Sequence, residues 1–263
     1  MKSLHKVLDI IDFIALSGRA GIREISEKTG FPPPTAHRLV STLVGRHYLE
    51  KDPATKGYSL SLKFLELGSL VQHGFDLVRI ARPHLELMVA ETKESASLVV
   101  RDGDEAVYLD HVQDQHMLQL FTRVGARVPL YSTGGGKVLL AGMADAEIAS
   151  YLKRCTRTRH TARTLTDAGA LMKTLAQVRQ KGFAVDDEEM ETGIRCVAVP
   201  VYRHDGSVAA SLSVTGATVR IPRERIEELA RIAHYRALCI SRALGFNPEK
   251  TKTTVTKEER HHG

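Results

Sequence analysis

The sequence lacks the features of a membrane or secreted protein. No apolar run approaches the length that spans a bilayer, and residues 1–16 are amphipathic where a signal peptide would have an apolar core. Only three cysteines occur in 263 residues, at the widely spaced positions Cys155, Cys196 and Cys239. An odd number of distant cysteines argues against a disulfide framework and for a reducing compartment. The sequence therefore predicts a cytoplasmic protein with no membrane partner.

Recognisable sites for nucleotides, metals and covalent catalysis are also missing. The run TGGGKV at residues 133–138 is not a nucleotide P-loop, because that pattern would need glycine at Tyr131 and Ser or Thr at Val138. Histidines and cysteines do not have zinc-finger spacing, and no Ser-His-Asp or Cys-His arrangement is recognisable locally. The acidic run at residues 186–189 lacks calcium-loop spacing, and we expect it to be mostly solvated. We therefore expect no metal, no cofactor and no enzyme activity.

The composition indicates a globular protein that could bind nucleic acid. Hydrophobic residues make up 43% and charged residues 26% of the chain, which argues against general disorder, and the length leaves room for two domains. The net charge of +6 and isoelectric point near 9.2 suit a nucleic-acid partner. Many proteins this basic bind no nucleic acid, so the partner class has to come from a motif.

Residues 21–60 provide such a motif. Gly30 can end a first helix in the left-handed conformation, and prolines 32–34 suit the first turn of a second helix. Strand-like runs at 48–50 and 58–60 flank a turn marked by Asp52-Pro53 and Lys56-Gly57. Helix, turn, helix and two-stranded wing in this order are typical of a winged helix-turn-helix, which places one helix in the DNA major groove. The alternative is a three-helix piece that binds no DNA.

The second helix of this motif has a buried stripe and a polar face. Its apolar positions recur with a 3.6-residue period from Ala36 to Val44, and the opposite face carries hydroxyls, one imidazole and one guanidinium, which can read base edges and hold phosphates. In a further helix that precedes this motif, we expect Leu4, Val7, Leu8 and Ile11 to form the apolar stripe that closes the core. The candidate DNA-binding residues are Arg23, Pro34, Thr35, His37, Arg38, Ser41, Thr42, Lys51 and Lys56.

Beyond residue 60, the pattern changes to a mixture of helices and hairpins. Asp102-Gly103 and Asp205-Gly206 are strong hairpin dipeptides, and Pro83 should kink or break its helix. An antiparallel sheet backed by helices, an α+β sensor-like domain, fits this order. The predicted elements are helices at 61–73, 76–93, 137–151, 167–181 and 222–244, hairpins within 95–112 and 196–216, and strands at 117–121 and 183–186.

The chain resembles the isocitrate lyase regulator (IclR) family of bacterial transcription factors from about Leu4 to Gly245. The similarity lies in the winged-helix segment, in the run G-x-R-x-P-L-Y-S-T-G-G-G-K-V-L-L-A at 125–141, and in GIRCVAVPVYRHDGSVAASLSVTG at 193–216. The resemblance implies a winged helix-turn-helix joined by a linker helix to a GAF-like or profilin-like effector-binding domain. We expect a DNA-binding domain at 1–60, the linker helix at 61–75, the effector domain at 76–247 and a disordered tail at 248–263.

The resemblance also implies an effector pocket. Glycines before a helix can let a ligand reach free N–H groups, which form a ready anion site, and serines two apart on a strand face one side. A small organic acid would suit such a pocket, although the charge of Asp186 would repel an anion unless that residue accepts from a ligand hydroxyl. The glycines could equally form a simple loop, and the serines could be satisfied within the sheet. The implied effector-binding residues are Leu120, Gly134, Gly135, Gly136, Asp186, Ile194, Cys196, Ser211 and Ser213.

These features together predict a ligand-responsive DNA-binding regulator. We expect a homodimer or homotetramer that recognises a pseudo-palindromic double-stranded operator and represses a catabolic operon, with a small organic acid as effector. One alternative is an activator, or a regulator controlled by a partner protein. The alternative of another class is a small-molecule enzyme with a DNA-binding appendage.

Overall fold

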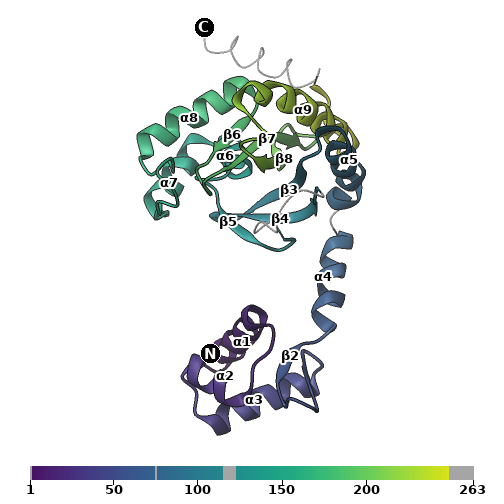
Figure 1. The fold of residues 1–263 in the computed structure, drawn as a ribbon, viewed down its shortest axis with the longest axis vertical. Coiled ribbons are helices and arrows are strands. Elements are labelled where there is room, and N and C mark those ends of the chain that lie inside the picture. Colours follow the sequence, from purple (N-terminus) through teal and green to yellow (C-terminus); the bar gives the residue numbers. More distant parts are fainter. Residues whose placement is uncertain (1, 75, 115–122, 249–263) are drawn as a thin grey trace. The chain divides into compact units, whose positions relative to one another are not determined.

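The computed structural model describes residues 2–74, 76–114 and 123–248, and it divides the chain into two compact units, Met1–Phe75 and Asp76–Gly263 (Figure 1). The predicted strand at 117–121, with the candidate residue Leu120, and the tail from 249 onwards lie outside the described residues. No helix within the described ranges is long and apolar enough to cross a membrane.

The first unit is a helical core with a two-stranded wing. Gly30 ends the second helix with a φ of 70°, and Pro33 and Pro34 occupy the first turn of the third, as the sequence predicts. The wing strands pair antiparallel, with Leu49 opposite Leu60. In chain order the elements are α1 (Lys2–Ser17), α2 (Ile22–Thr29), α3 (Pro33–Gly45), β1 (Leu49–Lys51), β2 (Tyr58–Leu60) and α4 (Lys63–Gly74).

Helix α1 closes this core through a different stripe from the predicted one. Ile10 and Ile14 are fully buried, whereas Leu4 and Leu8 are 66% and 50% exposed. The prediction is therefore wrong for the two leucines. The helix carries two overlapping apolar stripes, and contact with α2 and α3 selects the one that contains the isoleucines.

The second unit is a six-stranded antiparallel sheet in the order β5-β4-β3-β8-β7-β6, with helices on both faces. This confirms the predicted α+β class. The elements are α5 (Asp76–Thr92), β3 (Ser95–Asp102), β4 (Glu105–Val112), β5 (Arg127–Pro129), α6 (Gly134–Ala141), α7 (Asp145–Arg154), α8 (Ala168–Lys181), β6 (Ala184–Asp187), β7 (Ile194–Tyr202), β8 (Val208–Ala217), the 3-10 turn η1 (Arg223–Arg225) and α9 (Ile226–Ala243).

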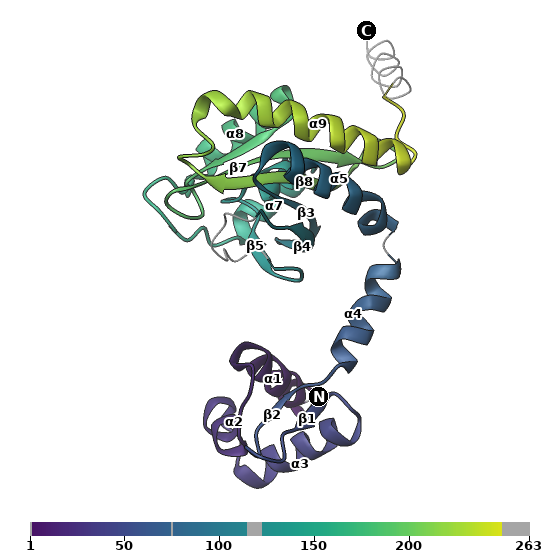
Figure 2. The same cartoon turned by 45° about the vertical axis from the view of Figure 1, so that its right-hand side comes forward.

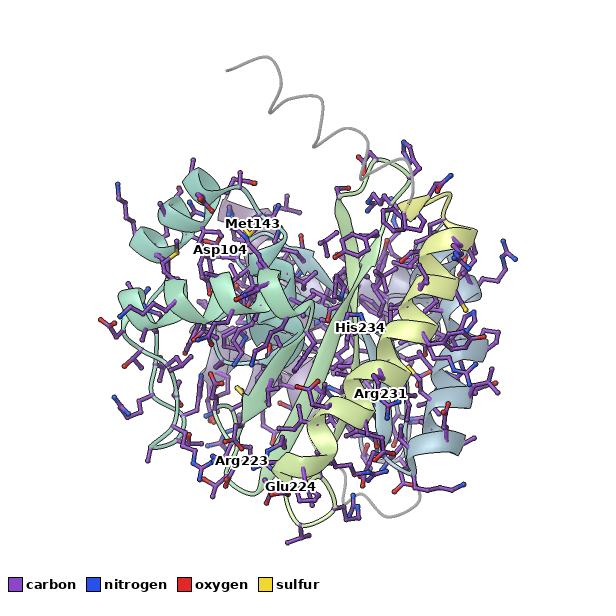
Figure 3. All side chains as sticks on the ribbon, turned by 90° about the horizontal axis from the view of Figure 1, so that it is seen from above. Asp104, Met143, Arg223, Glu224, Arg231 and His234 are labelled. Carbon is purple, nitrogen blue, oxygen red and sulfur yellow. The ribbon has the colours of Figure 1, made fainter. Side chains whose placement is uncertain are left out.

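Alternation along the strands creates two separate cores. Side chains such as Val197 and Leu212 pack against α5 and α9, whereas Val99 and Ala198 on the other face pack against α6, α7 and α8. Figure 2 shows α9 running along β7, and Figure 3 shows the sheet between α9 and α5 on one side and the green helices on the other. Each face of the sheet therefore belongs to a different set of helices.

Two predicted helices differ from the observed ones. The predicted helix at 137–151 is two helices, α6 and α7, because the chain leaves helical geometry between Gly142 and Ala144. Pro83 was expected to kink or break its helix, and the break does not occur, because α5 is continuous from Asp76 to Thr92. The proline is on the exposed side, while Leu85 and Met88 are fully buried. The free energy gained by burying Leu85 and Met88 outweighs the loss of the backbone hydrogen bond that Pro83 cannot donate.

The separate cores lead to a prediction about domain independence. A fragment of residues 76–248 should fold alone and melt in one cooperative transition, because both faces of its sheet are covered by its own helices. Calorimetry of the purified fragment measures this. Broad, non-cooperative melting would show that the first unit supplies part of its core.

Candidate functional site

A cavity of about 210 Å³ lies in the second unit between the first turn of α6 and the sheet. Strand pairing explains its floor, because Asp186, Cys196 and Thr215 are opposite one another on β6, β7 and β8. The cavity is lined by Val99, Tyr108, Val128, Thr133, Gly134, Gly135, Asp186, Met190, Glu191, Ile194, Cys196, Ser213 and Thr215.

Six of the nine implied effector residues line this one cavity. They come from three segments that are far apart in the sequence, namely the start of α6, the β6–β7 hairpin and β8. Leu120 lies outside the described residues. The six are Gly134, Gly135, Asp186, Ile194, Cys196 and Ser213.

Gly136 and Ser211 are placed differently from the expectation. The Gly136 N–H donates to Thr133 Oγ1 at 3.1 Å, and a Cβ at this position would lie 2.5 Å from Leu130 Cα and closer still to its carbonyl oxygen. Its glycine therefore serves helix packing and capping. Ser211 is fully buried, and its hydroxyl donates to Val199 O at 3.4 Å. Neither residue lines the cavity.

The N–H groups of Gly134 and Gly135 have no hydrogen-bond partner among the described residues. They belong to the first turn of α6, whose N-terminal N–H groups have no partner within the helix. Adding a Cβ at Gly135 would make only ordinary contacts, 3.5 Å to Ser211 Oγ and 3.6 Å to Val99 Cγ2. This part of the backbone is therefore open to the cavity.

Seven of the lining residues are not among those predicted from the sequence. Thr215 could have been found, because it continues the alternation of Ser211 and Ser213 along β8. Tyr108 reaches the cavity through a register shift between Leu98 and Val99, which no local pattern signals. The missed residues are Val99, Tyr108, Val128, Thr133, Met190, Glu191 and Thr215.

The acidic run at 186–189 is not mostly solvated, contrary to the expectation. Asp186 and Glu189 are only 4% and 6% exposed, and Lys137 of α6 is fully buried beside them. Lys137 Nζ donates to Val185 O at 2.6 Å and pairs with Glu189. Asp187 points to the other face of β6 and pairs with Arg195. The run is buried at two positions because strand alternation and the following turn direct these side chains inwards.

Burial sets the protonation of this cluster. Desolvation raises the pKa of Asp186 to about 7, although Lys137 and the N–H of Glu189 act in the opposite direction. The pKa of Glu189 is also raised by burial, against the effect of Lys137. Burial raises the pKa of the Cys196 thiol to about 11, so the thiol is protonated and unreactive at neutral pH.

The first unit presents the predicted reading face of α3 to solvent. Ala36, Leu39, Val40 and Leu43 are buried as predicted, which turns the opposite face outwards. No acidic residue occurs between Lys28 and Leu49. Pro34, His37, Arg38, Ser41 and Thr42 are exposed, and Thr35 is half-buried.

Some of these side chains already have partners. Thr42 Oγ1 donates to Arg38 O at 3.0 Å, and the exposed Arg23 on α2 pairs with Glu27 at 2.9 Å. The Arg38 guanidinium has no ion-pair partner among the described residues. It is thus available to an external acceptor.

The wing is stabilised by Arg19, which is not among the residues predicted from the sequence. Arg19 pairs with Asp52 at 2.7 Å and covers Gly57, where a Cβ would lie 2.8 Å from Arg19 Cγ. Lys51 and Lys56 are exposed, and Lys56 takes a φ of 55° in the turn. The cationic wing tip is therefore held by a short, ordered loop.

A winged helix with an exposed reading face, in a chain that also has a ligand-sized cavity in a separate unit, defines the class of ligand-responsive DNA-binding regulators. Comparison with known families gives the same class. The family described as "Bacterial transcriptional regulator IclR C-terminal" matches residues 70–242, and "IclR helix-turn-helix domain" matches residues 3–53. The chain belongs to the IclR family of bacterial transcriptional regulators.

Individual relatives agree with this assignment. The HTH-type transcriptional regulator KdgR of Escherichia coli (strain K12) is 35% identical over 94% of both chains. The crystal structure of Thermotoga maritima IclR is 34% identical, with a TM-score of 0.81, over 94% of this chain and 100% of that one. An IclR homologue from Microbacterium hydrocarbonoxydans, crystallised with 4-hydroxybenzoate, shares the fold at 24% identity and a TM-score of 0.81, over 92% and 98% of the chains. The relatives are regulators of transcription, so the expectation that the chain is not an enzyme is confirmed.

The buried ion pair leads to a prediction about stability. Lys137→Met should lower the free energy of unfolding by about 3–5 kcal/mol at pH 8, because it leaves the carboxylates of Glu189 and Asp186 buried without their cation. The loss should be smaller at pH 6, where these carboxyls take up protons more readily. Urea unfolding measures both values. Lys173→Met, on the exposed face of α8, is the matched control, and a loss as small as in this control would contradict the prediction.

Proposed function

We propose that the chain represses a catabolic operon and that a small organic acid bound in the α6 cavity releases it from its operator. The observation that carries the proposal is the pair of partnerless N–H groups of Gly134 and Gly135, which line the cavity at a helix N-terminus. Such groups bind anions through aligned peptide dipoles and direct hydrogen bonds.

The rest of the cavity suits an acid that also carries a hydroxyl group. Ser213 and Thr215 offer hydroxyls along β8, and Val99, Val128 and Ile194 supply apolar wall. The Microbacterium homologue holds 4-hydroxybenzoate, an acid of this type, which supports the ligand class. We propose a carboxylate on the two glycine amides, with hydroxyl contacts from β8.

The DNA contacts that we propose come from α3 and the wing. His37, Arg38 and Ser41 would face base edges and phosphates in the major groove, and Lys51 and Lys56 would meet the backbone beside it. Pro34, Thr35 and Thr42 would flank the contact, with Arg23 at its margin.

Assembly is proposed from the apolar surface that the first unit leaves exposed. Leu4 and Leu8 on α1 and Leu65 on α4 are at least half exposed, and exposed apolar surface can mark a site of protein association. A symmetric dimer through α1 and the linker helix would cover them, and two dimers could form a tetramer. Symmetry would then require a pseudo-palindromic operator. We propose the boundaries 1–60 for the DNA domain, 61–75 for the linker and 76–247 for the effector domain.

Repression is the direction of regulation that requires the fewest contacts with other proteins. A dimer that occupies an operator bars polymerase from the same DNA without touching any other protein. Release then needs only that the acid binds the DNA-free arrangement more tightly. In a reporter strain with the intact operator, deletion of the gene should raise transcription, and a fall would instead indicate an activator.

Arg38→Ala tests the reading face. It should cost about 1–3 kcal/mol of operator binding if the guanidinium contacts a guanine or a closely packed phosphate. Lys56→Ala should weaken all DNA alike and reduce the salt slope by about one. Fluorescence anisotropy titrations at several salt concentrations measure both. Arg231→Ala removes the same charge from the exposed surface of α9 (Figure 3), and Arg38→Ala binding as tightly as this control would remove Arg38 from the interface.

Gly135→Ala tests the cavity. The added methyl group has room beside Ser211 and Val99, so the protein should keep its melting temperature and operator affinity while acid binding falls about tenfold or more. Gly136→Ala is the matched control for a packing glycine. It should destabilise the domain, because its methyl group would collide with the Leu130 backbone. Calorimetric titration with a panel of hydroxy acids measures the first effect, and normal acid affinity in Gly135→Ala would place the pocket elsewhere.

A further inference from the structure

The cavity that should take an anion already contains a buried carboxyl group. Asp186 Oδ1 accepts from the N–H of Glu189 at 2.7 Å and more weakly from Met190 at 3.4 Å. Its second oxygen, Oδ2, has no hydrogen-bond partner among the described residues, and the side chain lines the cavity. A ligand in the cavity would therefore meet this carboxyl group directly.

The buried cluster around Asp186 has more negative than positive groups. Lys137, fully buried, pairs with Glu189 and donates to a backbone carbonyl, so its three donors are not directed to Asp186 alone. Glu189 Oε2 is buried and has no partner in the described part of the chain. Two buried carboxyls thus share one ammonium group. A third carboxylate, from a ligand, would add like charge to a site where solvent screening is weak.

The other titratable groups that face Asp186 do not relieve this charge. Tyr108 on β4 and Cys196 on β7 have pKa values that burial raises, so they are already protonated near neutral pH and can take up no further proton. Glu191, on the turn after β6, also lines the cavity, and its ionised form would add to the repulsion. Asp186 is the cavity group best placed to give up its charge.

We propose that the acid effector enters this cavity together with one proton, which Asp186 carries in the bound state. The inference rests on the proposed function, because it concerns the acid that this function requires. The protonated carboxyl group donates a hydrogen bond to the ligand, whereas the ionised carboxylate repels it. The fraction of the regulator that holds the effector then depends on the concentration of the acid and on the concentration of protons.

The protonated form costs little in the free protein. Burial already raises the pKa of Asp186 to about 7, so it is about half protonated at that pH. A bound anion raises the pKa further. Protons bound in the complex then exceed those bound in the free protein, and by linkage the acid binds more tightly as pH falls from 8.5 to 6.5.

Calorimetric titration of the wild-type protein tests this directly. The probes are lactate and 4-hydroxybenzoate, whose carboxyls are ionised throughout this pH range. The dissociation constant should rise about tenfold between pH 6.5 and 8.5. Repeating the titration at pH 7.5 in two buffers of different ionisation enthalpy should show an uptake of about 0.5–1 proton per ligand.

Two variants locate the proton. Asp186→Asn should bind the probe with the same affinity at both pH values, within about twofold, and with no proton uptake, because its amide cannot titrate. Glu188→Gln removes a neighbouring carboxylate that pairs with Arg163 outside the cavity, and it should keep the wild-type dependence on pH.

The outcomes separate the two proposals. Binding of a probe without pH dependence or proton uptake in the wild type overturns the proton inference and leaves the proposed function intact. A pH dependence that persists in Asp186→Asn also overturns it, since the proton then belongs elsewhere. If Asp186→Asn does not fold, the wild-type proton count alone decides. Failure of every acid in the panel to bind at any pH overturns the proposed function, and the inference with it.

Discussion

The second unit depends on the close approach of α6 to the sheet. A Cβ at Gly136 would meet the Leu130 backbone, and one at Gly134 would lie 3.1 Å from Cys196 Sγ. Side chains at these two positions would push α6 away from β7 and from the Leu130 backbone. Because Gly134–Gly136 have no side chains, the first turn of α6 forms one wall of the cavity and presents two backbone N–H groups there. Helix packing and the proposed ligand contacts therefore involve the same few residues.

The close packing of α6 against the sheet also explains the charges around the cavity. Lys137 follows directly after the glycine turn, so it is carried into the interior with α6, where it pairs with Glu189 and acts electrostatically on Asp186. Asp187, one residue on, pairs with arginines on the opposite face of its strand. A buried lysine requires a buried acid close by. The resulting cluster gives the cavity its electrostatic character, which a bare helix N-terminus would not predict.

The two units use charge in opposite ways. The reading face of α3 and the wing expose their cations to water, where salt screens their charge. The cavity and its surroundings contain backbone N–H groups and buried charged groups, which salt screens much less. Ionic strength should therefore act more strongly on the exposed cations of the first unit than on the groups in and around the cavity.

Local sequence determined the elements with strong periodicity or clear breaks, including α3 with its prolines, the ending of α2 at Gly30 and the hairpins at Asp102-Gly103 and Asp205-Gly206. Six residues implied for the effector site do line one cavity. The elements could be predicted because turn chemistry and helical period act over a few residues, whereas the six site residues were implied by the resemblance to the IclR family.

Only tertiary structure decided the remainder. Whether Leu8 or Ile10 of α1 is buried depends on contact with α2 and α3, and whether Pro83 breaks α5 depends on the core beneath that helix. Tyr108 reaches the cavity through a register shift, and Gly136 is excluded from it by contact with Leu130. Burial of Asp186 is likewise a property of the packed sheet and helix. Each of these outcomes depends on contacts between segments far apart in the chain, where no pattern within a short window carries the information.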